Sequence, residues 1–386
     1  MSPKNKPILP GAIIGIFGGG QLGRMSALAA RSMGYHVHIY SDVPGCPADA
    51  IADKTWIGAY NDVDQVTAFA KAVDVATFEF ENVSSVAADT AGKHCPVRPN
   101  GQVLHIAQNR LREKTFLKES GIPVAPFSRI ESLEDLKEAI SRQGTPGVLK
   151  TAGFGYDGKG QQKMDGTVDP DDAWASFEGQ QAVYESFIDF TKEISVVGAR
   201  TPDGRFKAFP VLENTHANHI LDVSFAPAAV SPAVSAQAVE LTEKIMKDLD
   251  AVGLLTVEMF LTADDRVIVN EMAPRPHNSG HLTMNGCVTS QFEQHIRAVC
   301  NLPLGETDVL CPCAMANVLG DWWFADESDQ STEPAWAAAL SIPETFLHLY
   351  GKTEARRKRK MGHINALGPS TKDAVQRAVE ARSRLR

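Results

Sequence analysis

The sequence predicts a protein of mixed α/β and α+β class with more than one domain, and three stretches carry that prediction. An apolar run at residues 12–17 enters a glycine turn and then an amphipathic pattern, which is typical of a parallel α/β sheet. A second glycine-rich stretch, residues 153–160, follows a short apolar run. Two alternating apolar runs flank residues 263–266 and predict an antiparallel hairpin. A length of 386 residues is sufficient for two or three domains.

The first domain is expected to span residues 1–112 and to be Rossmann-like. Its pattern predicts a strand at residues 12–17, a helix at 22–33, a second strand at 35–42 and a later one at 73–82. The last of these ends in acidic residues, at the edge where an open parallel sheet presents its ligand side.

A second domain is expected at residues 113–301, with a small α+β lid subdomain at about 124–188. The pattern predicts helices at 110–120, 132–144 and 235–250, strands at 147–150 and 181–188, and a hairpin at 193–214 that turns at Asp203-Gly204. The "QQKMDGT" stretch that follows the second glycine loop is polar and predicts a turn. The third region, residues 302–386, is mixed, with a tryptophan-rich acidic loop and a basic strand.

The composition excludes some classes of binding partner. The formal net charge is -9 and the sequence pI is about 5.7, so a broad affinity for nucleic acid or anionic lipid is not expected. Six cysteines without a C-x-x-C pair predict reduced thiols in a cytoplasmic protein. No apolar run approaches the ~18 residues of a membrane span.

The first glycine turn has two competing interpretations. Gly18, Gly20 and Gly23 satisfy G-x-G-x-x-G between a strand and a helix, and Asp42 ends the second strand, so a nicotinamide enzyme fits the motif. The turn itself indicates only that backbone N–H groups at a helix N-terminus face an anion or a polar group. A tight strand-to-helix connection without a ligand is the simpler alternative.

The second glycine loop, within "LKTAGFGYDGKGQ", resembles a P-loop only in part. Gly160 stands where Ser or Thr would hold the metal, and the polar stretch after it does not predict a helix. A flap that folds its amides over nucleotide phosphates, with Lys150 as a fixed positive charge, fits the pattern better. A mobile surface hairpin is the alternative.

The hairpin around residues 263–266 predicts a divalent-metal site. A turn centred between Asp264 and Asp265 places Glu258 opposite Glu271, and Phe260 opposite Val269. Facing carboxylates repel unless their charge is offset, and Mg²⁺ commonly takes one or two carboxylates with substrate phosphates and water. Asn270 adds a neutral oxygen, although strict alternation places it on the other face. The alternative is a pair of solvated glutamates at a sheet edge.

Five motifs together resemble a known family. The stretches "GGGQLGRM", "FEFEN", "GYDGKGQ", "NEMAPRPHNSGH" and "GHIN", in this order across residues 13–365, are similar to those of 5-(carboxyamino)imidazole ribonucleotide synthetases of the ATP-grasp superfamily. The resemblance implies an ATP-grasp fold with an N-terminal Rossmann-like (pre-ATP-grasp) domain, a small lid and a C-terminal β-rich region that completes a ribonucleotide site. It also implies that the first glycine turn binds no dinucleotide.

The resemblance further implies site residues. Those expected to bind ATP are Arg110, Lys150, Gly155, Tyr156, Asp157, Gly158, Lys159, Gly160, Gln161, Glu185, Ser186, Phe187, Ile188, Glu193, His216, Asn270 and Glu271. Those expected to bind the ribonucleotide are Gln21, Leu22, Glu79, Asn278, Ser279, Lys352, Arg359 and Lys360. Those expected near the chemistry are Tyr156, Asp157, Arg275 and His277, and the expected magnesium ligands are Glu258 and Glu271. Without the resemblance, the six basic residues of "KTEARRKRKMGHIN" also fit a solvated face or a nuclear signal.

The implied activity is the ATP-dependent carboxylation of 5-aminoimidazole ribonucleotide by bicarbonate, through carboxyphosphate, in purine biosynthesis. ATP and Mg²⁺ are the implied cofactors, and bicarbonate and the ribonucleotide are the other small-molecule partners. A homodimer and a fused carboxylase (mutase) domain are further expectations, with no nucleic-acid or membrane partner. The alternatives are another ATP-grasp ligase, either formate-using (transformylase-like) or biotin carboxylase-like, a nicotinamide oxidoreductase and a non-catalytic binding module.

Overall fold

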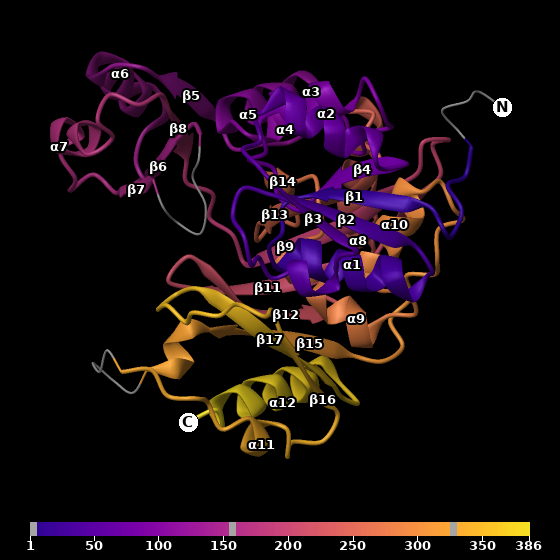
Figure 1. The fold of residues 1–386 in the computed structure, drawn as a ribbon. Coiled ribbons are helices and arrows are strands. Elements are labelled where there is room, and N and C mark those ends of the chain that lie inside the picture. The colour runs from indigo at the N-terminus through magenta and orange to yellow at the C-terminus, as the bar shows by residue number, and fades with distance from the viewer. Residues whose placement is uncertain (1–5, 154–159, 325–329) are drawn as a thin grey trace.

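A computed structural model describes residues 6–153, 160–324 and 330–386, and within them the chain forms three sheets (Figure 1). One sheet belongs to the N-terminal region, one to a lid that stands at a corner of the molecule, and one long sheet runs through the rest. Residues 1–5, 154–159 and 325–329 lie outside the described chain.

The N-terminal sheet is parallel, in the order β3-β2-β1-β4, which confirms the predicted open α/β sheet. Its strands are β1 (Ile13–Phe17), β2 (His36–Ser41), β3 (Lys54–Ile57) and β4 (Val75–Phe78). Its helical segments are α1 (Gln21–Ser32), η2 (Asp49–Ile51), α2 (Val63–Lys71), α3 (Ser85–Ala91) and α4 (Gly101–Ala107). Because β1 and β4 pair in parallel, the glycine turn after β1 and the acidic "EFE" stretch after β4 meet at one edge.

The lid is a four-stranded antiparallel sheet in the order β5-β8-β6-β7, covered by two helices. Its elements are β5 (Phe127–Ile130), α6 (Leu133–Gln143), β6 (Gly147–Thr151), β7 (Gln161–Met164), α7 (Pro170–Ala175) and β8 (Ala182–Ser186). The turn predicted for "QQKMDGT" is wrong for its first half, because Gln161–Met164 pairs with β6 as a strand. Pairing with β6 supplies the backbone hydrogen bonds that a polar sequence alone does not indicate.

The long sheet has nine strands, eight of them in the order β14-β13-β9-β11-β12-β15-β17-β16, with β10 paired to β9. The strands are β9 (Lys192–Arg200), β10 (Phe206–Ala208), β11 (Leu212–Ala217), β12 (Ile220–Ala226), β13 (Gly253–Leu261), β14 (Val267–Ala273), β15 (Cys313–Leu319), β16 (Thr345–Leu349) and β17 (Lys360–Leu367). The β9–β10 pair confirms the hairpin predicted around Asp203-Gly204. Since β12 pairs with β15, the sheet continues across residue 301, where the sequence suggested a domain boundary.

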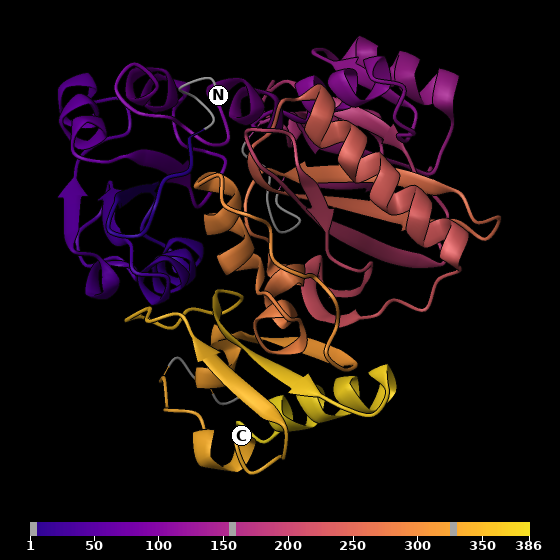
Figure 2. The ribbon, with the colours of Figure 1, turned by 90° about the vertical axis from the view of Figure 1, so that its right-hand side faces the viewer.

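Helices cover this sheet and join it to the N-terminal region. They are α5 (Arg110–Glu119), α8 (Pro232–Asp248), η3 (Asn278–Leu282), α9 (Thr283–Gly286), α10 (Gln291–Val299), η4 (Gly320–Trp323), α11 (Trp336–Ala339) and α12 (Thr371–Ser383). Figure 2 shows α10 between the N-terminal region and the long sheet, and its Ile296 and Val299 pack into the core beneath β1 and β2. This shared core fixes the N-terminal sheet against the strands that carry the site.

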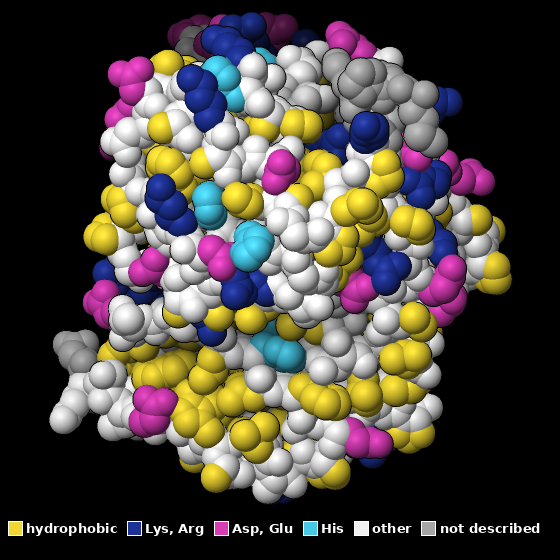
Figure 3. Space-filling model, turned by 45° about the vertical axis from the view of Figure 1, so that its right-hand side comes forward, with side chains coloured by type: hydrophobic (Ala, Val, Ile, Leu, Met, Phe, Trp, Pro, Cys, Tyr) yellow, Lys and Arg dark blue, Asp and Glu magenta, His cyan; other side chains and the backbone are white. Residues whose placement is uncertain are grey.

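The C-terminal region differs from expectation in one respect. Residues 352–359, which we call the basic loop, lie between β16 and β17 rather than in a strand, and only Lys360 of the basic run begins β17. On the face drawn in Figure 3, charged side chains of both signs are mixed, and hydrophobic side chains gather over the lower, C-terminal part. All six cysteines are free thiols. Within the described ranges, no helix combines the length and apolar character needed to cross a bilayer.

Candidate active site

The first glycine turn is closed by the protein's own carboxylate. The backbone N–H of Gly23 donates to Glu79 Oε2 at 2.7 Å, and that of Gly20 donates to Glu79 Oε1. Glu79 therefore occupies the N-terminus of α1, where a dinucleotide phosphate would have to bind. Burial raises the Glu79 pKa, and the two N–H donors oppose that rise. The geometry favours an internal anchor over the nicotinamide interpretation.

This packing predicts an intolerant glycine. Gly18 has φ +103°, and a Cβ there would lie 2.3 Å from Glu79 Cγ. We expect Gly18→Ala to destabilise the fold by about 1–3 kcal/mol through overpacking, in addition to the backbone strain of positive φ. Urea denaturation of Gly11→Ala gives the matched control, because Gly11 has φ +93° and no atom within 4 Å of its Cβ position. Equal losses in the two variants would contradict the account of the turn.

A large cavity of about 680 Å³ opens beside this turn, and we call it the first cavity. It lies between the start of α1, the end of β14 and the basic loop. Both acidic and basic side chains line it. The predicted residues that line it are Gln21, Leu22, Glu79, Arg110, Glu271, Arg275, His277, Asn278, Lys352, Arg359 and Lys360. Ser279 is predicted to bind the ribonucleotide, but it is fully buried and lies outside this lining.

The second cavity, of about 450 Å³, lies between the lid and the β13–β14 hairpin. The predicted residues that line it are Arg110, Lys150, Gln161, Glu185, Ser186, Phe187, Ile188, Glu193, His216, Glu258, Asn270, Glu271, His277, Asn278 and Lys360. Residues 155–159 of the glycine flap lie outside the described chain, and Gly160, with φ +66°, precedes β7. The side chains common to both cavities are Arg110, Glu271, His277, Asn278 and Lys360. The two cavities therefore share a wall.

Glu258 and Glu271 pair directly across the hairpin, as predicted. Between this pair and the hairpin turn the register changes, because Met259 pairs with Val269 and Asn270 is an extra residue in β14. The prediction that Phe260 faces Val269 is therefore wrong, and Phe260 pairs with Ile268. The bulge brings Asn270 to the same cavity as both glutamates, where strict alternation would turn it away. Within the described residues, its buried Oδ1 atom has no hydrogen-bond partner.

Two glutamates and one amide oxygen form a donor set that fits Mg²⁺. Burial, followed by the charge of Glu271, raises the Glu258 pKa to about 8. Burial also raises the pKa of Glu271, but Arg110, whose Nη1 lies 2.9 Å from its Oε2, and Lys150 outweigh that effect and lower it to about 2. Among the described residues there is no group of three or more His, Cys, Asp or Glu side chains placed to hold a metal. Two carboxylates and one amide oxygen fill only part of an octahedron, which leaves positions for phosphate and water.

This carboxylate pair predicts a pH-dependent stability. Between the ordinary glutamate value of 4.5 and about 8, the folded state holds a proton on Glu258 that the unfolded chain has released. Stability without a divalent ion should therefore fall as the pH rises through this interval, and added Mg²⁺ should restore it most at the upper end. Thermal unfolding of wild type against Glu258→Gln measures the difference, since the amide does not titrate. An identical pH profile for the two proteins would contradict the assignment.

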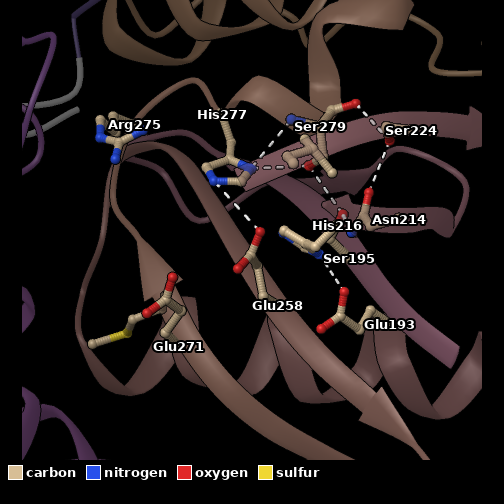
Figure 4. A network of polar contacts seen from close by, with 12 residues as sticks. Glu193, Ser195, Asn214, His216, Ser224, Glu258, Glu271, Arg275, His277 and Ser279 are labelled. Atoms are coloured by element: carbon tan, nitrogen blue, oxygen red, sulfur yellow. Dashed lines mark hydrogen bonds and ion pairs between the residues drawn. The ribbon is translucent and has the colours of Figure 1, made fainter. Parts of the chain in front are cut away.

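His277 lies at the shared wall, beside Glu258 (Figure 4), and Arg275 lines the first cavity. Arg275 forms an ion pair with Glu81, with Nη2 3.1 Å from Oε1. His277 Nε2 lies 3.5 Å from Glu258 Oε1. Burial first, and then the positive charges of Arg275 and Lys360, lower the His277 pKa to about 3, so the imidazole is neutral.

The lid side of the second cavity contains further ion pairs. Lys150 Nζ lies 3.1 Å from Glu185 Oε2, and Glu193 contacts His216 Nδ1. Burial lowers the His216 pKa, but the hydrogen bond and charge of Glu193 outweigh it and the net change is upward. Each of these pairs joins two residues that the sequence analysis placed at ATP.

Helix α5 carries site residues that the sequence analysis missed. Lys114 is 1% exposed, and its Nζ lies 3.3 Å from Glu185 Oε2, so Glu185 is held between Lys114 and Lys150. Glu113 accepts a hydrogen bond from the Met272 N–H at 2.6 Å, next to Glu271. Arg110, Glu113 and Lys114 are spaced i, i+3 and i+4, which places three charged side chains on one helix face. This spacing is visible in the sequence and could have indicated Glu113 and Lys114 as site residues.

A nucleotide-sized cavity between an antiparallel lid and a hairpin of facing carboxylates defines an ATP-grasp ligase. The domain models agree: the ATP-grasp domain matches residues 115–292, the ribonucleotide synthetase preATP-grasp domain residues 12–108, and the phosphoribosylaminoimidazole carboxylase C-terminal domain residues 313–377.

Relatives narrow the family. The chain is 42% identical over 369 residues to the N5-carboxyaminoimidazole ribonucleotide synthase of Bacillus subtilis (strain 168). This alignment covers 96% of this chain and 95% of that protein. The bifunctional purine synthesis protein purC/E of Dictyostelium discoideum is 40% identical over 92% of this chain and 37% of its own length. The Aspergillus clavatus N5-carboxyaminoimidazole synthase, solved with ADP and 5-aminoimidazole ribonucleotide, superposes with a TM-score of 0.87 at 30% identity and covers 98% of this chain and 100% of that one. The chain belongs to the N5-carboxyaminoimidazole ribonucleotide synthase family, ATP-dependent ligases of purine biosynthesis.

Proposed function

We propose that the protein carboxylates 5-aminoimidazole ribonucleotide with bicarbonate, forming ADP, phosphate and the N5-carboxylated ribonucleotide. The observation that carries this proposal is the wall shared by the two cavities. Arg110, Glu271, His277, Asn278 and Lys360 border both of them. An activated carboxyl group made in the second cavity would lie next to the first cavity. An amine bound there could therefore react with it before it is released to solvent.

The second cavity is proposed to hold ATP. Arg110 and Lys150 place two positive charges beside the carboxylate pair and would bind the phosphates. Phe187 and Ile188 would line the adenine, and Glu193, held by His216, would accept hydrogen bonds from the ribose. The flap residues 155–161, including Tyr156 and Asp157, are proposed to cover the phosphates and the transfer step.

Glu258, Glu271 and the amide oxygen of Asn270 are proposed to hold Mg²⁺. The unpartnered, buried Asn270 Oδ1 and the two facing carboxylates support this choice. When bound, the ion supplies charge that offsets the phosphate oxygens. The protein's own part is to hold these oxygens in a fixed arrangement, which Arg110 does for Glu271 and the Glu113 contact with Met272 N–H does for the strand.

The first cavity is proposed to hold the ribonucleotide. Lys352, Arg359 and Lys360 would bind its phosphate, and Gln21, Leu22 and Glu79 would contact the remainder. Bicarbonate is proposed to attack the γ-phosphoryl group near Arg275 and His277. The carboxyphosphate formed is labile in water, so the residues around the shared wall must exclude solvent until the amine captures CO₂. A homodimer, a cytoplasmic location and a fused carboxylase domain stay predictions, and the length of the Dictyostelium relative is compatible with the last of these.

An isotope experiment tests the carboxyphosphate route. If a bicarbonate oxygen attacks phosphorus, that oxygen remains on the phosphate when the C–O bond breaks. With [¹⁸O]bicarbonate, the released phosphate should carry ¹⁸O in step with the formation of carboxylated product. Phosphate that carries only solvent oxygen, while product forms, would contradict this route.

A further inference from the structure

His277, at the shared wall, is held firmly at its backbone. Gln291 Oε1 accepts from the His277 N–H at 3.0 Å, and Gln291 Nε2 donates to the His277 carbonyl at 2.8 Å. His277 also caps the 3-10 helix η3. These bonds fix the backbone at His277, and the contacts of the two ring nitrogens indicate which of them carries the proton.

The contacts at Nδ1 answer that question. The backbone N–H of Ser279 donates to His277 Nδ1 at 3.3 Å. A backbone amide nitrogen can only donate, so Nδ1 must present its lone pair. Ser279 Oγ lies 2.9 Å from the same atom and so must donate as well. A ring nitrogen that accepts hydrogen bonds carries no proton, so the ring proton is on Nε2, the atom that faces Glu258 Oε1 (Figure 4).

A buried chain of hydrogen bonds behind Ser279 has the same direction. Because Ser279 uses its proton on His277, its oxygen accepts from Ser195 Oγ at 3.0 Å. Ser195 in turn accepts from Asn214 Nδ2 at 3.0 Å, and Asn214 Oδ1 accepts from Ser224 Oγ at 2.8 Å. The three serines are 0% exposed, so water does not compete for their bonds, and Asn214, at the edge of the second cavity, is 6% exposed. Ser224 Oγ also donates to the Ser279 carbonyl at 3.1 Å, so the part of the chain directed toward His277 runs from Asn214 through Ser195 to Ser279.

We propose that Ser279, Ser195 and Asn214 are positioning residues that fix His277 as the Nε2–H tautomer. His277 then donates a hydrogen bond to an anionic oxygen at the shared wall and does not accept the proton of the amine through Nε2. The role assigned to Ser279 changes with this proposal, because Ser279 acts through His277 and does not touch substrate. The proposal rests on the proposed function for the identity of that anion, but the tautomer itself does not depend on it.

The tautomer can be measured directly in the wild-type enzyme. Two-bond ¹H–¹⁵N spectra of protein labelled with [¹⁵N]histidine distinguish a protonated from an unprotonated ring nitrogen, and the signal missing in His277→Gln identifies His277. We expect protonated Nε2 and unprotonated Nδ1, without any substrate present. A protonated Nδ1 would overturn the proposal, even if the enzyme makes the expected product.

Paired variants test the kinetic consequence. Ser279→Ala removes the shorter donor to Nδ1, and we expect kcat to fall about 10- to 100-fold, with much smaller changes in KM for ATP and ribonucleotide. A population of the Nδ1–H form should appear in the same spectra. Ser41→Ala is the matched control, because it removes a buried hydroxyl that donates to the Val43 carbonyl at the end of β2 and lines neither cavity. Equal effects of the two variants on kcat and on the tautomer would show a merely structural role and overturn the proposal.

Discussion

Glu271→Gln should turn over substrate about 100-fold or more slowly than wild type and should remain folded. Glu271 lies opposite Glu258, 2.9 Å from Arg110 Nη1, and it borders both cavities. The amide keeps the shape of the side chain but removes the negative charge that a divalent ion and Arg110 need. Folding should survive because the amide keeps the volume of the side chain and its oxygen can still accept a hydrogen bond from Arg110.

The same substitution at Glu213 provides the control for Glu271→Gln. Glu213 is in the same sheet and pairs with Lys192 at 2.8 Å, but it lines neither cavity. Steady-state turnover with circular dichroism separates activity from folding, and Glu213→Gln should stay close to wild type in turnover. Wild-type activity of Glu271→Gln would contradict the metal and phosphate assignment.

Arg359→Ala should raise the KM for the ribonucleotide about 10-fold or more and change the KM for ATP much less. Arg359 lines the first cavity and does not line the second, and its Nη1 is held by the Glu354 carbonyl at 2.7 Å. A guanidinium held in place can bind a phosphate through two parallel N–H groups, and alanine supplies neither.

Two further variants make the Arg359 result specific. Lys360 borders both cavities, so Lys360→Met should raise both KM values. Arg384 pairs with Glu380 on α12 and lines neither cavity, so Arg384→Ala changes the net charge by the same amount without a binding defect. Equal increases of the ATP and ribonucleotide KM in Arg359→Ala would contradict the phosphate pocket.

Features set by local patterns could be predicted from the sequence. The apolar run before Gly18 and the amphipathic pattern after Gly23 predict a strand, a turn and a helix, and all three occur. The Glu258–Glu271 pair follows from counting outward from a turn at Asp264-Asp265. These relations depend on neighbours in the chain, where backbone preference and alternation decide the geometry.

Features that depend on contacts between distant parts of the chain could not be predicted from the sequence. The contact of Glu79 with Gly20 and Gly23 joins residues more than fifty positions apart, and no local pattern indicates which carboxylate fills a helix N-terminus. The bulge at Asn270 depends on the fit of β14 against β13 and moves an amide to the other face. The hydrogen-bonded chain behind His277 joins residues of four separate elements. The sequence does not indicate which serines are buried or which residues they contact.

The most direct test of the account is phosphate release from MgATP and bicarbonate, measured with and without 5-aminoimidazole ribonucleotide. The shared wall predicts strong stimulation by the ribonucleotide, with one bicarbonate-derived carbon in product for each ADP, because the carboxyl group made in one cavity is used in the other. ATP hydrolysis that is indifferent to the ribonucleotide would contradict the proposed reaction and would direct the search to another carboxylate or amine substrate.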